Sequence, residues 1–114
     1  MTIALVLFAL AALGGVTMAV IRFRGAERPP TALALAHGAL AAAGLIALIV
    51  AVMGATPGLG RTALLVLIVA ALGGFFLFAM HMQKKALPIP LMVVHALVAV
   101  VGFLILIAAV THAA

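Results

Sequence analysis

The stretch "TALALAHGALAAAGLIALIVAVMG", residues 31–54, decides the fold class because it is long and apolar and contains one ionisable side chain, His37. A transmembrane helix needs about 20 predominantly apolar residues. Comparable runs occupy about 2–21, 62–82 and 89–111. Backbone N–H and C=O groups in lipid must bond within their own segment, so each run is expected to be a helix. The pattern predicts four transmembrane helices.

The overall composition supports this interpretation. Of the 114 residues, 70% are hydrophobic and 6% are charged, whereas soluble domains are about 45–50% apolar and about 25% charged. We therefore predict an all-α membrane protein in which residues 1–114 form a single four-helix transmembrane bundle. Cysteine is absent, which excludes disulfides and thiolate metal sites. No basic residue precedes the first run, so it is expected to be a retained helix and not a secretory signal peptide.

Basic residues are distributed unequally among the loops. The first and third loops carry five of the six Lys and Arg residues, and the second loop carries Arg61. The five are Arg22, Arg24, Arg28, Lys84 and Lys85. Because cytoplasmic loops are enriched in Lys and Arg, both termini are expected on the periplasmic side of a bacterial inner membrane. The bias accounts for the net charge of +5 without a nucleic-acid partner, and the lipid bilayer is the expected partner of these loops.

The two halves of the chain, about 1–56 and about 60–114, resemble each other. Each half carries a glycine pair in its first helix, followed by Pro, His and Gly in its second. The matched elements are ALGG at 12–15 and 71–74, Pro30 and Pro88, His37 and His95, and Gly44 and Gly102. Self-similarity of this kind predicts two duplicated helical hairpins related by a pseudo-two-fold axis along the membrane normal.

The residues common to the second and fourth helices lie on one helical face. They are spaced by three or four positions, which is the spacing of a single stripe on an α-helix. The second helix carries this stripe as Leu33, His37, Ala41, Gly44 and Leu48. His37 and His95 each follow a proline by seven residues, so both are expected roughly 10 Å inside the same end of the bundle. The two glycine pairs fall at a similar depth.

Such a layer predicts a haem site. Haem iron accepts two axial ligands on opposite faces, and neutral imidazole is a common one. His37 and His95 are the predicted axial ligands of a single haem b. Glycines are expected to line the macrocycle and basic residues to lie near the propionates: Gly14, Gly15, Gly73, Gly74, Arg22, Lys84 and Lys85. His81 is expected to be a surface neighbour of this site.

A four-helix membrane bundle with paired helix histidines beside glycines resembles the b-type cytochromes that anchor or accompany respiratory dehydrogenases. The resemblance covers the architecture and the layer that contains His37 and His95. It implies an electron carrier rather than a stand-alone enzyme, with quinone or a larger membrane redox complex as partner. The chain departs from the dihaem members, which use four ligand histidines at two depths, because it has one matched pair.

Two other functions remain open. A small non-catalytic subunit or scaffold of a larger complex needs no cofactor, and its histidines would bond across the bundle. A copper or other metal site is the second alternative, because Met80, His81 and Met82 offer soft thioether and imidazole ligands. His37, His81 and His95 could also share a metal ion. No intramembrane carboxylate is available for proton or drug transport, because the sole acidic residue lies in the first loop.

Overall fold

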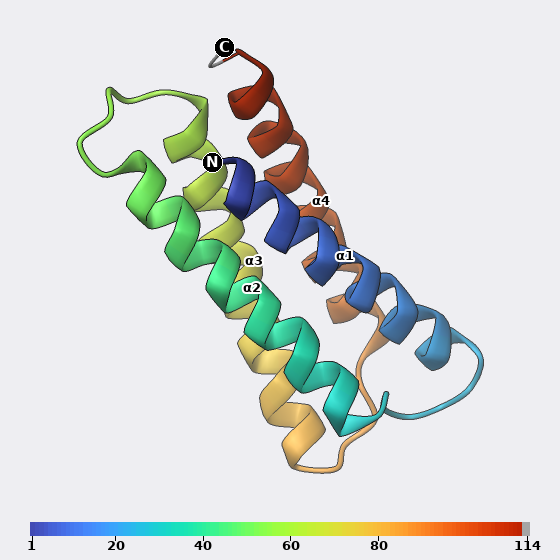
Figure 1. Cartoon of the computed structure of the whole chain (residues 1–114). Helices are drawn as coiled ribbons and strands as arrows, with labels where there is room; N and C mark the ends of the chain where they lie inside the picture. The colour runs from blue at the N-terminus through green and yellow to red at the C-terminus, as the bar shows by residue number, and fades with distance from the viewer. Residues whose placement is uncertain (113–114) are drawn as a thin grey trace.

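The computed structural model describes residues 1–112, and this part of the chain is entirely helical apart from its loops (Figure 1). The helices are α1 (Thr2–Phe23), α2 (Thr31–Val52), α3 (Leu59–Met82) and α4 (Ile89–His112). All are long and apolar enough to span a membrane, as expected of an integral membrane protein. The shortest have 22 residues and rise about 33 Å, against a hydrocarbon core about 30 Å thick. The predicted four-helix transmembrane bundle is confirmed.

The helix ends follow the Pro and Gly residues with small differences from the predicted limits. Helix α3 begins at Leu59, three residues earlier than expected, directly after Gly58. Helix α2 ends at Val52, since Gly54 adopts a left-handed backbone with φ 75°. Helix α4 includes Pro90 in its first turn, where the missing N–H of proline has no helical partner to lose.

The helices form two antiparallel hairpins, α1/α2 and α3/α4, which pack more extensively within each hairpin than against each other. Two helix pairs pack between the hairpins, and of these α1 and α4 make less contact than α2 and α3. The N-terminus and the 53–58 loop lie at one end of the bundle, and the 24–30 and 83–88 loops lie at the other (Figure 1). We call the latter the basic end. Its two loops are joined by the Leu87 N–H, which donates to the Glu27 carbonyl at 3.1 Å.

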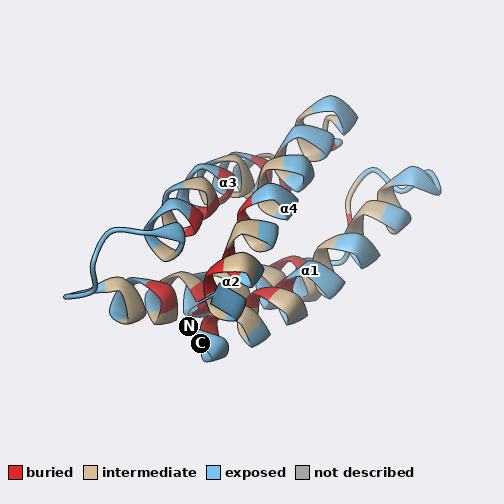
Figure 2. Cartoon of the chain, turned by 90° about the horizontal axis from the view of Figure 1, so that it is seen from above, coloured by how far each residue is buried: buried red, intermediate tan, exposed pale blue. Residues whose placement is uncertain are grey.

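The buried core lies in the half of the bundle away from the basic end. Its members are Ala4, Phe8, Leu48, Ala63, Leu67 and Leu106. Buried positions face neighbouring helices, and exposed positions cover the outside (Figure 2). Large apolar side chains such as Leu72 and Leu104 are among the exposed ones. A protein that spans a membrane presents such an apolar exterior to lipid, which solvates it as well as another helix would. His37, His81 and His95 lie in the other half, nearer the basic end.

Candidate functional site

His37 and His95 meet between the two hairpins. Their ring centroids are 6.4 Å apart and the ring planes are inclined at 83°. The two residues come from α2 and α4, and both side chains are half-buried. The sequence predicted that they share one depth, and in the structure the two rings lie close together in an edge-to-face arrangement.

Each imidazole is held by a backbone carbonyl of the other helix in its own hairpin. His37 Nδ1 lies 2.7 Å from the Ala11 oxygen, and His95 Nδ1 lies 2.8 Å from the Ala70 oxygen. A carbonyl oxygen only accepts, so each Nδ1 carries the hydrogen and donates it. In a neutral imidazole the lone pair then resides on Nε2. Metal-binding histidines usually have this arrangement, in which the other ring N–H is bonded to a carbonyl or carboxylate.

The glycine pairs make room for the imidazoles themselves. A Cβ added to Gly15 would lie 3.1 Å from His37 Cε1, and one added to Gly74 would lie 3.1 Å from His95 Cε1. The first glycine of each pair also packs against the histidine, since an added Cβ would meet it at 3.6 Å. The predicted site glycines therefore seat the two rings against α1 and α3. The glycines concerned are Gly14, Gly15, Gly73 and Gly74.

The two carbonyl acceptors are functional groups that the sequence analysis missed. Ala11 and Ala70 are buried, with 3% and 5% of their surface exposed. Each lies three residues before a glycine pair, in the identical strings AALGG at 11–15 and 70–74. This common spacing is the available signal, although a backbone acceptor leaves no mark in residue type. The small alanine side chains allow the imidazoles to approach the carbonyls closely.

The predicted basic residues separate into two groups. Arg22, at the end of α1, donates through Nε to the Leu87 oxygen at 3.0 Å and through Nη1 to the Ala26 oxygen at 3.3 Å. It therefore joins the 24–30 and 83–88 loops, close to the start of α4. Lys84 and Lys85 follow the end of α3, and Lys84 lines a pocket on the α2/α3 side. Among the three basic residues predicted to lie near the propionates, Arg22 is therefore the one with a hydrogen bond beside α4.

An apolar groove of about 180 Å³ lies between α1 and α4 near the histidine layer. Ala19 and Phe23 of α1 form one wall, and Ala96, which adjoins His95, belongs to the other. The remaining residues of the α4 wall are Met92, Val93, Leu97 and Val100. The groove is thus placed at the weakest helix–helix interface, with Arg22 next to Phe23 at its basic end.

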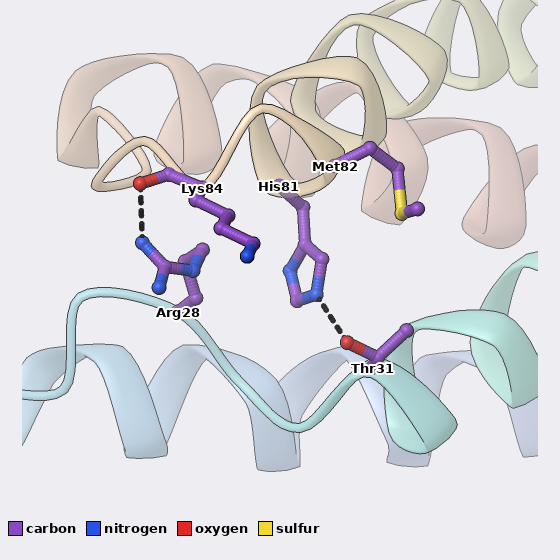
Figure 3. A pocket seen from close by; sticks show the side chains of 5 residues that line it. All are labelled: Arg28, Thr31, His81, Met82 and Lys84. Carbon is purple, nitrogen blue, oxygen red and sulfur yellow. Dashed lines mark hydrogen bonds between the residues drawn. The ribbon is translucent and has the colours of Figure 1, made fainter.

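His81 is not the surface neighbour that the sequence suggested. Its side chain is buried, with 6% of the residue exposed, and its Nε2 atom lies 3.0 Å from the Thr31 hydroxyl oxygen (Figure 3). The Phe78 ring lies parallel to it with centroids 6.2 Å apart. His81 is buried because the end of α3 packs beside the start of α2, a contact between segments about fifty residues apart in sequence. Periodicity within a single helix does not reveal that contact.

The metal-site alternatives find little support in this geometry. In residues 1–112, no group of three or more His, Cys, Asp and Glu side chains is arranged to hold a metal ion. The described residues therefore give no support to a metal site shared by His37, His81 and His95. Helix α3 continues through Met82, so Met80, His81 and Met82 project in different directions around its axis.

Comparison with other proteins yields no family assignment. No family model, curated protein or solved structure matches this chain. The geometry of the two histidines and their surroundings therefore provides the basis for assigning a function.

Proposed function

We propose that this protein is a membrane electron carrier that binds one haem b between His37 and His95. The supporting observation is the pair of imidazoles, each bonded through Nδ1–H to a carbonyl, with ring centroids 6.4 Å apart. Each ring keeps its Nε2 lone pair free of these carbonyl bonds, so His37 and His95 would hold one haem iron from two different helices.

A two-histidine donor set suits haem better than a free metal ion. Structural zinc and copper sites take three or four protein ligands, whereas haem iron needs only two axial ones. The haem supplies one-electron redox chemistry when it is bound. The protein's own contribution is to hold and orient: the Ala11 and Ala70 carbonyls fix the tautomer of each imidazole and raise its basicity as a ligand.

The interface between the hairpins offers part of the space that a macrocycle needs. The apolar groove beside His95 suits a porphyrin edge, but its volume of about 180 Å³ holds only part of a haem. Binding therefore requires α1 and α4 to separate beside His95. Of the helix pairs that pack together, these two make the least contact. Arg22, which precedes the groove residue Phe23 and donates to the Leu87 oxygen near the start of α4, is the propionate partner that this arrangement favours.

We further propose that the basic end faces the cytoplasm of a bacterial inner membrane, with both termini in the periplasm. Arg22, Arg24, Arg28, Lys84 and Lys85 belong to this end, and retention of Lys- and Arg-rich loops in the cytoplasm is the general rule. The histidine layer then lies in the cytoplasmic half of the membrane. Quinone or a larger membrane redox complex on that side is the proposed electron donor or acceptor.

An absorption spectrum tests the proposal directly. Protein expressed with adequate haem supply and purified in mild detergent is recorded oxidised and after reduction with dithionite. A sharp low-spin b-type spectrum is expected, and His37→Ala or His95→Ala should each abolish it because six-coordinate iron needs both ligands. His112→Ala is the matched control, since this exposed histidine lies at the opposite end of α4. A colourless wild-type protein contradicts the proposal and leaves the scaffold function.

A further inference from the structure

We propose a second site, a pocket at the basic end between α2 and α3 that binds the phosphate group of an anionic ligand. The pocket has a volume of about 320 Å³ and is lined by Arg28, Thr31, His81, Met82 and Lys84 (Figure 3). A phospholipid headgroup and free phosphate are the two sources of this chemistry at a membrane surface. The site is separate from the proposed haem site, which lies between His37 and His95.

The charge around the pocket favours an anion. Arg28 and Lys84 contribute two cations, and Thr31 is the first residue of α2. The first backbone N–H groups of a helix have no intrahelical partner, and the helix dipole adds partial positive charge there. Glu27 lies 3.6 Å from Arg28 Nη1, but its side chain is 71% exposed, so its charge is largely screened by solvent. The pocket is therefore positive overall.

His81 supplies the observation that points to a ligand. The residue is 6% exposed, and its Nδ1 atom is buried without a hydrogen-bond partner. Its other nitrogen, Nε2, is occupied by the Thr31 hydroxyl at 3.0 Å. When that hydroxyl donates to Nε2, Nδ1 carries the hydrogen and requires an acceptor. Nδ1 lies on the ring edge facing Lys84 (Figure 3), so an anion held by the lysine would provide the missing acceptor oxygen.

The backbone of Lys84 is also unusual for a lysine. Its φ of 58° is left-handed, and its N–H donates to the His81 carbonyl at 3.0 Å in a helix-ending turn where glycine is the usual residue. The corresponding turn after α1 has Gly25, with φ 109°. The Lys84 carbonyl accepts a hydrogen bond from Arg28 Nη1 at 2.6 Å. Lys84 therefore places a cation at a strained backbone position, and a hydrogen bond ties the second cation, Arg28, to the same residue.

Binding is measured with two probes. Native mass spectrometry of the detergent-solubilised protein counts retained lipid after addition of phosphatidylglycerol or phosphatidylcholine, and the thermal midpoint is compared in sodium phosphate and sodium chloride at equal ionic strength. Selective retention of phosphatidylglycerol without a phosphate effect identifies a lipid headgroup. A phosphate effect alone identifies free phosphate, and both together identify the phosphate group from either source. Absence of both effects overturns the proposal.

Charge variants distinguish a defined pocket from general attraction to the basic loops. Arg28→Gln and Lys84→Gly are each expected to weaken binding about tenfold or more, the usual effect of losing one charged hydrogen-bonding partner. Lys85→Gln is the matched control, since Lys85 is in the same loop but does not line the pocket. An equal loss in Lys85→Gln overturns the proposal, because it would show that the attraction is diffuse.

Two substitutions of His81 test the role of Nδ1. The amide of His81→Asn occupies nearly the place of Nδ1, whereas the amide of His81→Gln extends to the place of Nε2 and keeps the Thr31 bond. Binding should be retained better in His81→Asn than in His81→Gln, with the circular dichroism of both variants confirming folding. Wild-type affinity in both variants overturns the proposal. His37→Ala should leave binding unchanged; its loss there would mean that the pocket serves the haem and is not an independent site.

Discussion

The Nδ1 atom of His37 donates to the Ala11 carbonyl oxygen at 2.7 Å, and this bond decides which ring nitrogen is left for another partner. His95 and Ala70 form the same bond at 2.8 Å. The two nitrogens of each ring therefore have different roles, one in packing a hairpin and the other in the proposed binding of iron. Variants that keep only one nitrogen can separate these roles.

His37→Asn and His95→Asn should preserve the fold and remove the haem. Asparagine can keep a donor near the place of Nδ1, so the bond to the carbonyl of the neighbouring helix is retained, but nothing replaces Nε2. The expected result is a thermal midpoint close to that of haem-free wild type, without the b-type absorption band. Absorption and circular dichroism on the same samples measure both properties. A wild-type haem band in either variant would exclude that histidine as a ligand.

Gly15→Ala and Gly74→Ala should destabilise the protein by about 1–3 kcal/mol, the range for overpacking a close contact. The added Cβ would lie 3.1 Å from the Cε1 atom of His37 or His95, so the ring must shift away from its carbonyl. Gly38→Ala is the control, because nothing lies within 4 Å of its added Cβ. There the change should be neutral or stabilise the helix by about 0.5–1 kcal/mol. Unfolding by denaturing detergent measures the difference, and equal stabilities would contradict the packing role.

Gly102→Ala should also be destabilising, for a reason unrelated to the histidines. Its added Cβ would lie 2.8 Å from both Cγ and Cδ2 of Leu67, a core side chain that is 5% exposed. Leu67 has little free space into which it can move, so we expect a cost of about 1–3 kcal/mol. The double variant Gly102→Ala with Leu67→Ala should lose less stability than the sum of the two single losses, measured by the same unfolding assay. Additive losses would show that the two residues do not share the contact.

Lys84→Gly should increase stability while it weakens anion binding. Left-handed backbone costs a non-glycine residue about 1–2 kcal/mol, partly offset by the greater flexibility of glycine in the unfolded chain. A net gain of about 0.5–1 kcal/mol is expected without added phosphate or anionic lipid. Lys84→Ala removes the same charge but keeps the backbone strain, so it should show no gain. A gain of equal size in both variants would assign the effect to charge and not to backbone conformation.

Single cysteines test the proposed orientation, because the chain contains none of its own. Thr56→Cys lies in the loop between α2 and α3, and Ala86→Cys lies in the loop between α3 and α4. Both positions are exposed. A membrane-impermeant maleimide added to intact cells with a permeable outer membrane should label Cys at 56 and leave Cys at 86 unlabelled until the inner membrane is opened. The reverse pattern would invert the orientation without changing the four helices.

The sequence alone determined the four helices and the common depth of His37 and His95. In lipid the backbone has to satisfy its own hydrogen bonds, so a sufficiently long apolar run has one structural solution. Depth follows from the constant rise per residue, counted here from Pro30 and Pro88. Both inferences use local information only, and for this reason they required no knowledge of how the helices pack.

Only the tertiary structure decided which groups surround the histidines. The Ala11 and Ala70 carbonyls became partners because α1 and α3 are rotated so that their glycine pairs admit an imidazole. His81 was expected at the surface and is buried, because Thr31 and the start of α2 cover it. The rotation of each helix, and the packing of the end of α3 on the start of α2, depend on contacts between distant segments. A chain composed largely of Ala, Leu and Val has many apolar faces of nearly equal quality, so its pattern does not specify which of them meet.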